Sequence, residues 1–174
     1  MARGLTHRGT ARAVILVVLS AVATACTERN EVHPRVGAAE FCALNRVVDG
    51  DGVRLNCGPG RENLNVRLQC IDAPEPDQAP WGDGATERLR DLVAPQVGLR
   101  SMDIDRYGRT IGRIYRNEQD LNLRLVYEGK AAVYPRYCDD PAYYDAERLA
   151  RRAARGIWAE PGLHHEPWQW RRVR

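Results

Sequence analysis

The sequence contains no CxxC pair, no internal repeat and almost no lysine. Its histidines stand away from the cysteines, at His7, His33, His164 and His165, and this spacing argues against a zinc site. Lys130 is the single lysine, so every other basic side chain is an arginine, which suits bidentate contacts to phosphate. A compositional bias of the genome explains the excess of arginine equally well. Without repeats, 174 residues suggest one ordinary domain and a leader.

Residues 1–25 have the three parts of an export signal. Arginines precede an apolar run at 13–19, no acidic residue is present, and small residues end just before Cys26. The run is short for a membrane span, which makes an uncleaved anchor the weaker interpretation. The small residues fit an ordinary signal peptidase, yet small residues followed by Cys26 also resemble a bacterial lipobox. We therefore expect an exported protein, either secreted or periplasmic, or attached to the membrane at the cell envelope by a lipid on Cys26.

The positive net charge comes from the leader. The chain carries 26 basic and 23 acidic residues, and Arg3, Arg8 and Arg12 lie within the predicted signal, so the remainder is about neutral. General electrostatic adhesion to nucleic acid is therefore not predicted. Any polyanion has to be bound by a local cluster.

One folded domain is predicted over residues 41–174. Residues 26–40 mix charge, proline and glycine without periodicity and are predicted to form a tether. Strand patterns follow at 41–48, 52–57, 64–71, 97–104 and 110–116, and helix patterns at 84–94, 121–129 and 140–156. Five short strands with a helix between the third and the fourth form the sequence order of an OB-fold barrel. We therefore predict an α+β fold, a five-stranded OB-fold β-barrel with three helices, whose open face binds oligonucleotides.

Four acidic residues, Asp49, Asp51, Asp72 and Glu75, lie near the ends of adjacent predicted strands. Clustered carboxylates repel each other unless a cation lies among them, and hard oxygen ligands suit calcium or magnesium. The stretch VVDGDGVRL carries two acids in one turn, although a hairpin needs at most one. We predict that Asp51 binds the metal and that Asp49 shapes the turn or supports the site from behind. Alone, DGD is a common turn sequence.

Two arginines complete this candidate site. Val66, Leu68 and Cys70 share one face of the third strand, so Arg67 is predicted to face away from the core. Together Arg67 and Arg109 would clamp one phosphate, with Glu75 as the general base for an attacking water. Taken singly, Arg67 could be explained as a solvent-exposed strand residue. Arg109 could be explained as a partner in an ordinary ion pair with Asp105.

Together, these segments resemble the staphylococcal nuclease (thermonuclease) family. The matching pieces are VVDGDGVRL, VRLQCIDAPE, the PWG helix entry from Pro80, DRYGRTIGRIY, DLNLRLVYEGKA, and the ending AERLARRAARGIWAEP with PWQWR. They span about residues 42–171 in the family's order. The resemblance implies a calcium-dependent phosphodiesterase, an endonuclease acting on DNA and RNA and leaving 3′-phosphate ends. We expect it to act as a monomer.

The resemblance also assigns roles to residues of this chain. The calcium ligands would be the carboxylates of Asp51 and Asp72 and the backbone carbonyl of Ala73. The catalytic residues would be Arg67, Glu75 and Arg109. Tyr107 matches an aromatic residue that packs near the nucleotide, and Tyr134 or Tyr137 matches the base-stacking tyrosines.

This sequence departs from the family at several positions. Gly52 stands where the family usually has Thr or Ser after DGD, and the shorter loop PDQAPWG replaces the Lys-rich loop that follows the active-site glutamate in the best-known member. The four cysteines after Cys26 are an addition.

An even number of cysteines in an exported protein favours two disulfides, with three connectivities open. Cys42 and Cys57 lie on the two arms of the predicted hairpin. They are directly opposite if the loop is Asp49-Gly50, and offset by two residues if the turn is centred on Gly50-Asp51. The family resemblance places the segment with Cys138 near the third strand, so we expect Cys70 to pair with Cys138 and Cys42 with Cys57.

Two other classes of protein compete with a nuclease. One is a non-catalytic OB-fold module that binds nucleic acid or methylated peptides, and it has no need for Arg67, Glu75 and Arg109 together. The other is an anchored structural domain, for which the acidic cluster would be an unexplained cost. The specific combination of motifs therefore favours the nuclease.

Overall fold

The computed structural model describes Met1 and residues 39–173. The predicted export signal at 1–25, Cys26 and all but the end of the predicted tether therefore lie outside the described residues. Residues 39–173 belong to one compact unit. Among the described residues, no helix has the length and apolar character needed to cross a membrane.

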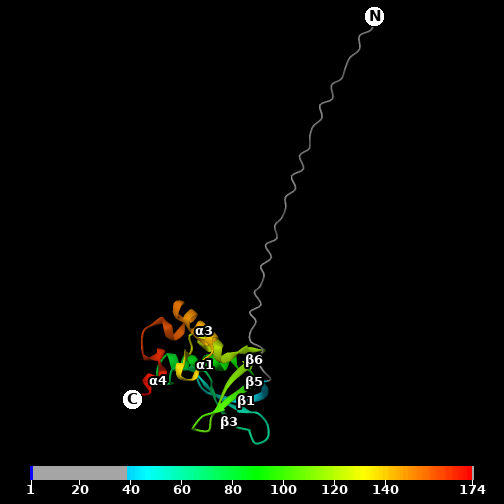
Figure 1. The fold of residues 1–174 in the computed structure, drawn as a ribbon, viewed down its shortest axis with the longest axis vertical. Helices are drawn as coiled ribbons and strands as arrows, with labels where there is room; N and C mark the ends of the chain where they lie inside the picture. Colours follow the sequence, from blue (N-terminus) through cyan, green and yellow to red (C-terminus); the bar gives the residue numbers. More distant parts are fainter. Residues whose placement is uncertain (2–38, 174) are drawn as a thin grey trace. The chain divides into compact units, whose positions relative to one another are not determined.

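Five strands form a closed barrel, as the sequence predicts. They are β1 (Glu40–Asp49), β2 (Gly52–Asn56), β3 (Leu64–Leu68), β5 (Gln96–Ile104) and β6 (Thr110–Arg116). The sheet order is β3-β2-β1-β5-β6, and a parallel pairing of β3 with β6 closes it (Figure 1). A short strand, β7 (Gln119–Asp120), pairs with β6 at the edge. This is the five-stranded barrel of an OB-fold.

Alternating apolar side chains fill the barrel. Val53, Leu55, Val66, Leu68 and Ile114 are at most 1% exposed. Polar or partly exposed residues stand between them along each strand, which is the period-two pattern of a strand with one face in the core. The residues between these core positions are therefore free to face the solvent or a binding site.

Three longer helices pack against the barrel, in the predicted order. They are α1 (Trp81–Leu92), α2 (Leu121–Tyr127) and α3 (Pro141–Arg152). Asp120 caps α2 by accepting a hydrogen bond of 3.0 Å from the Leu123 N–H. The predicted C-terminal boundary of α3 at Gly156 is wrong, because the helix ends at Arg152.

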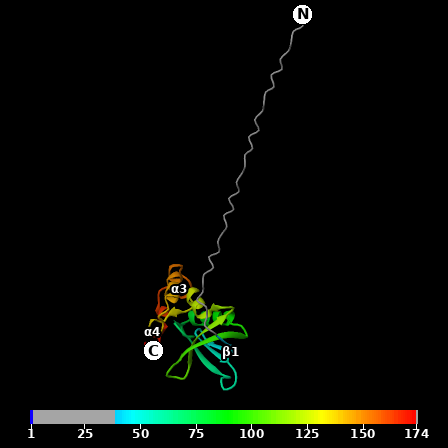
Figure 2. The ribbon, with the colours of Figure 1, turned by 45° about the vertical axis from the view of Figure 1, so that its right-hand side comes forward.

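The C-terminal part of the chain adds short elements that the sequence did not predict. They are the single-turn 3₁₀ elements η1 (Pro135–Tyr137), η2 (Gly156–Ala159) and η3 (Leu163–His165), and the helix α4 (Pro167–Trp170). Figure 1 and Figure 2 both show α3 and α4 on the same side of the domain, away from β1. The chain after α3 thus returns toward the loop that follows the third strand.

The β1–β2 hairpin turns at Gly50-Asp51, since Asp49 pairs with Gly52. This turn by itself would offset Cys42 from Cys57 by two residues. Two register shifts, between Val47 and Asp49 and between Leu44 and Arg46, move the pairing back to Leu44 with Leu55. Cys42 and Cys57 therefore come opposite each other and form a disulfide. The turn and the bulges together decide this pairing.

The strand predicted at 64–71 is interrupted, which corrects the sequence prediction. β3 ends at Leu68, and Cys70 has a positive φ of 69°. The chain then forms β4 (Ile71–Asp72), which leaves the barrel and pairs with β8 (Ala132–Val133). A disulfide joins Cys70 to Cys138, the partner expected from the family resemblance. The small β4–β8 sheet and this disulfide hold the Asp72 segment beside the segment that carries Tyr134 and Tyr137.

Candidate active site

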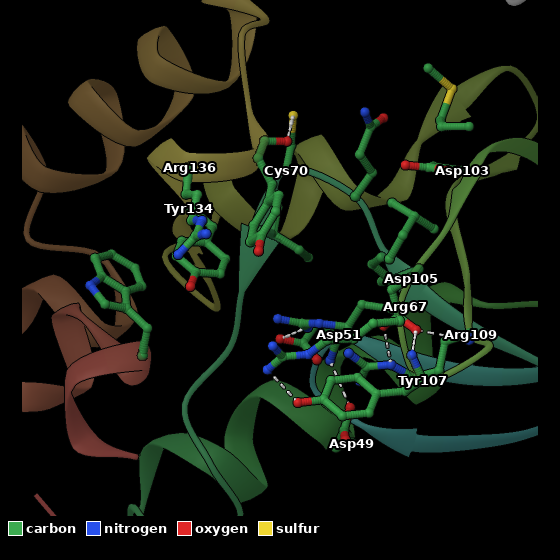
Figure 3. A pocket seen from close by; sticks show the side chains of 18 of the residues that line it. Asp49, Asp51, Arg67, Cys70, Asp103, Asp105, Tyr107, Arg109, Tyr134 and Arg136 are labelled. Carbon is green, nitrogen blue, oxygen red and sulfur yellow. Dashed lines mark hydrogen bonds and ion pairs between the residues drawn. The ribbon is translucent and has the colours of Figure 1, made fainter. Parts of the chain in front are cut away.

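A cleft of about 1110 Å³ collects most of the predicted site residues. Its lining includes Asp51, Arg67, Glu75, Tyr107, Arg109, Tyr134 and Tyr137. Asp72 and Ala73 lie beneath it, with 0% and 4% of their surface exposed. Figure 3 shows Asp51, Arg67, Tyr107 and Arg109 gathered on one side, with Tyr134 on the other. Residues predicted from separate motifs therefore belong to one site.

The DGD turn is built around two close approaches. Asp49 Oδ1 accepts a hydrogen bond of 3.2 Å from the Asp51 N–H, and Asp51 Oδ2 accepts one of 2.7 Å from the Ala73 N–H. A Cβ at Gly50 would lie 2.6 Å from the Ala73 Cβ and 2.8 Å from the Ala85 Cβ. Only glycine fits between these side chains. Asp49 thus shapes the turn, and Asp51 faces inward against Ala73.

Gly52 lies close to the side chain of Asp49. A Cβ at Gly52 would approach Asp49 Oδ1 to 2.7 Å. A Thr or Ser at this position would therefore require the carboxylate of Asp49, the free end of that side chain, to shift.

Arg67 joins the two predicted metal carboxylates. It lies on β3 opposite Gly52, and its guanidinium forms ion pairs with Asp51 and Asp72. Its side chain is 13% exposed, so it faces the cleft and is not a solvated strand residue. Burial lowers the pKa of Arg67, and the Asp72 carboxylate opposes this shift. An arginine remains charged under these conditions because its ordinary pKa is so high.

The loop 105–109 positions Arg109 through Asp105. Asp105 Oδ1 accepts hydrogen bonds of 2.9 Å from the N–H groups of Tyr107 and Arg109, and Oδ2 accepts one of 2.7 Å from Arg109 Nε. Gly108 supplies the positive φ of 75° that this tight loop needs. Burial would raise the pKa of Asp105, but these hydrogen bonds outweigh it and lower that pKa. Arg109 is thus both an ion-pair partner and a cleft residue.

Glu75 is held through its backbone by residues that the sequence did not single out. Gln78 Oε1 accepts a hydrogen bond of 2.8 Å from the Glu75 N–H, while the Gln78 N–H donates 2.8 Å to the Glu75 carbonyl. A Cβ at Gly82 would lie 1.9 Å from the Glu75 carbonyl oxygen. The start of α1 is therefore packed directly on the Glu75 backbone. This contact needs glycine at position 82.

Aromatic side chains stand at both ends of the cleft. Tyr107 is 68% exposed, and the guanidinium carbons of Arg106 and Arg109 lie 4.8 and 5.6 Å from its ring centroid. At the other end, Tyr134 meets Tyr137 edge to face at 5.0 Å. Both predicted stacking tyrosines therefore lie in the cleft.

The sequence analysis assigned no role to the C-terminal PWQWR, although its aromatic and basic character was visible. The Trp168 ring is nearly parallel to Tyr134, with centroids 5.1 Å apart and an interplanar angle of 9°. Arg171 forms ion pairs with Asp72 and Glu75. Burial acts to lower the pKa of Arg171, but these two carboxylates outweigh it and raise that pKa. Trp168 and Arg171 therefore contact residues of the predicted site, although they lie far from those residues in the sequence.

The donors at the centre of the cleft fit a hard cation. Asp51 and Asp72 supply two buried carboxylates, and the Ala73 backbone lies against Asp51. Oxygen donors of this kind suit calcium or magnesium. Within residues 39–173, Glu40, Cys42 and Cys57 also bring three potential ligand atoms within 4.8 Å of one another. That group cannot bind a metal through its sulfurs, because both are in the disulfide.

Fold and site together define an OB-fold protein whose cleft brings arginines and carboxylates together. The chain belongs to the staphylococcal nuclease family: the model for "Staphylococcal nuclease homologue" matches residues 65–160. A micrococcal nuclease of Shigella flexneri is 39% identical over 140 residues, covering 74% of this chain and 78% of that protein. An uncharacterized endonuclease of Haemophilus influenzae is 35% identical over 159 residues, covering 90% of this chain and 82% of that protein.

More distant relatives carry the same domain in longer proteins. A probable staphylococcal-like nuclease of Oryza sativa subsp. japonica is 35% identical over 108 residues, covering 62% of this chain and 29% of that protein. These relatives favour an enzyme over a non-catalytic binding module. The protein is therefore a nuclease, a hydrolase whose substrate is nucleic acid.

Proposed function

We propose that this nuclease is a calcium-dependent phosphodiesterase that hydrolyses both DNA and RNA and leaves 3′-phosphate ends. The observation that carries the proposal is the presence of Arg67, Glu75 and Arg109 in one cleft, above the buried carboxylate of Asp72. These are the side chains that hydrolysis of a phosphodiester needs: cations for the phosphate and a base for the water.

In this mechanism Arg67 and Arg109 bind the oxygens of the phosphate and stabilise the charge that develops there. Glu75 accepts a proton from the attacking water, whose oxygen forms a bond to phosphorus. The bond between phosphorus and the 5′ oxygen breaks, and that oxygen takes up a proton. The products then end in a 3′-phosphate and a 5′-hydroxyl.

The metal would be held by Asp51, Asp72 and the backbone carbonyl of Ala73. A bound calcium ion supplies positive charge that polarises a phosphate oxygen. Calcium accepts six to eight oxygen ligands, so three protein ligands leave room for water and substrate. Calcium suits this site better than magnesium, because calcium has the more flexible coordination geometry and accepts such a small set of protein oxygens.

Removal of calcium is expected to abolish the hydrolysis of DNA and RNA. The measurement uses the purified protein with single- and double-stranded DNA and with RNA, in calcium, in magnesium or in excess chelator. Activity should return when calcium is added back, and magnesium should restore less of it. Full activity in chelator would rule out the metal assignment. Products carrying 5′-phosphates would rule out the proposed bond cleavage.

We also propose that the protein is exported and that Cys26 decides where it remains. The export pattern of residues 1–25 supports this proposal. If Cys26 is acylated, metabolic labelling with a fatty-acid analogue should mark the protein, and Cys26→Ser should abolish the label. Unlabelled protein recovered from the medium or the periplasm would instead identify simple secretion.

A further inference from the structure

The C-terminal arm, residues Pro167–Arg172, forms part of the cleft wall. Trp168, Arg171 and Arg172 line the same cleft as Arg67 and Arg109. The family model matches residues 65–160, and the arm follows that range, although its PWQWR is among the segments that resemble the family.

Three contacts anchor the arm around the cleft. Trp168 stacks on Tyr134, and Trp170 Nε1 donates a hydrogen bond of 3.1 Å to Asp77 Oδ1. Arg171 Nη2 donates to Asp72, at 2.9 Å to Oδ2 and 3.1 Å to Oδ1, while its Nη1 donates to Glu75 Oε1. These contacts join the arm to Tyr134, to the loop after Glu75, and to the carboxylates of Asp72 and Glu75.

We propose that the C-terminal arm is part of the substrate site, in which Trp168 together with Tyr134 binds a nucleobase and Arg171 positions the Glu75 carboxylate. This inference rests on the proposed function of the cleft. It assigns the arm a part in the reaction in addition to any contribution to folding.

The stacking role follows from the geometry of Trp168. Its ring is stacked on one face of Tyr134 and so fixes the orientation of the tyrosine ring, at an end of a cleft that also exposes Arg136 and Arg172. Proteins of this architecture bind single strands by stacking bases on aromatic rings beside a basic groove. The packing of Trp168 against the buried cluster that contains Ala132 and Trp158 keeps its ring in place. A base can therefore stack on a surface that is already ordered.

The positioning role follows from the two partners of Arg171. Glu75 has a flexible side chain that is 33% exposed, whereas the side chain of Asp72 is fully buried. Because the Arg171 guanidinium is hydrogen-bonded to both residues, it restrains the flexible Glu75 carboxylate relative to the buried Asp72 carboxylate. The hydrogen bond from Arg171 uses Oε1 of Glu75 and does not require Oε2. A planar fork with several donors suits this bridge better than the single ammonium of lysine.

Steady-state kinetics with single-stranded DNA in calcium separate the two roles. Trp168→Ala should raise KM roughly fivefold or more with little change in kcat, and Trp168→Phe should keep most of the affinity. Arg171→Ala should lower kcat roughly tenfold or more with KM nearly unchanged, because a displaced base reacts slowly. Arg171→Lys should recover part of that loss. Arg148→Ala is the matched control, since Arg148 is 54% exposed and pairs with Asp145 on α3.

The outcomes distinguish this inference from the proposed function. If the wild type cleaves and both alanine variants keep its KM and kcat, or lose only thermal stability, the inference is wrong. If the wild type does not cleave, the proposed function fails, and binding of a labelled oligonucleotide still tests the arm. Equal dissociation constants for wild type and Trp168→Ala would then overturn the inference, and weaker binding by the variant would support it.

Discussion

Glu75→Gln is expected to lower kcat on DNA by roughly a hundredfold or more, because the amide cannot take the proton of the attacking water. KM should change little, since the variant leaves the arginines and the tyrosines in place. Folding should be retained: the Glu75 side chain is 33% exposed, and an amide oxygen can still accept the hydrogen bond from Arg171. Steady-state kinetics in calcium and a thermal unfolding curve measure both quantities. Near-normal turnover would remove Glu75 from the mechanism.

Arg67→Ala and Arg109→Ala should each lower kcat by about two decades or more, through lost stabilisation of charge on the phosphate. Their effects on stability should differ. Arg109 has a side chain that is 36% exposed, whereas the side chain of Arg67 is 13% exposed and bridges two carboxylates. Loss of Arg67 removes the guanidinium partner of Asp51 and leaves Asp72 with Arg171 alone, so only that variant should unfold at a clearly lower temperature.

Loss of the Cys70–Cys138 disulfide is expected to lower the free energy of unfolding by about 4 kcal/mol in the chain-entropy model, for a separation of 68 residues. The double variant Cys70→Ala with Cys138→Ala should also raise KM. The bond joins the turn before Asp72 to the residue directly after Tyr137, so its loss frees the tyrosine segment from the carboxylate segment. Denaturant unfolding and steady-state kinetics on the oxidised wild type and the variant test both effects.

The Cys42–Cys57 disulfide is the matched control for that experiment. It closes a separation of 15 residues, for which the same model gives about 3 kcal/mol. It lies on the β1–β2 hairpin, away from the tyrosines, so its removal should lower stability without raising KM. A variant lacking Cys70–Cys138 with unchanged KM would contradict the idea that this bond organises the cleft. Free thiols in exported protein would contradict both pairings.

The order and type of the main elements were predictable because local patterns determine them. Alternating apolar residues predict strands such as β2 and β6, and Asp120 predicts the start of α2. Breaks that depend on distant partners were not predictable. The strand at 64–71 ends early because the chain turns at Cys70 and pairs again with Val133, which lies more than sixty residues away along the sequence.

The sequence by itself determined the chemistry available to this protein: the DGD turn, the Arg and Glu side chains of the family motifs, and the cysteines. The tertiary structure decided how these groups meet. Of the two turns left open by the sequence it selected Gly50-Asp51, and it set the register of the disulfide with two bulges. It also packed Gly82 on the Glu75 backbone and brought Arg171 onto Asp72. Such contacts join positions far apart in the chain, and backbone closure and packing, which no local pattern encodes, create them.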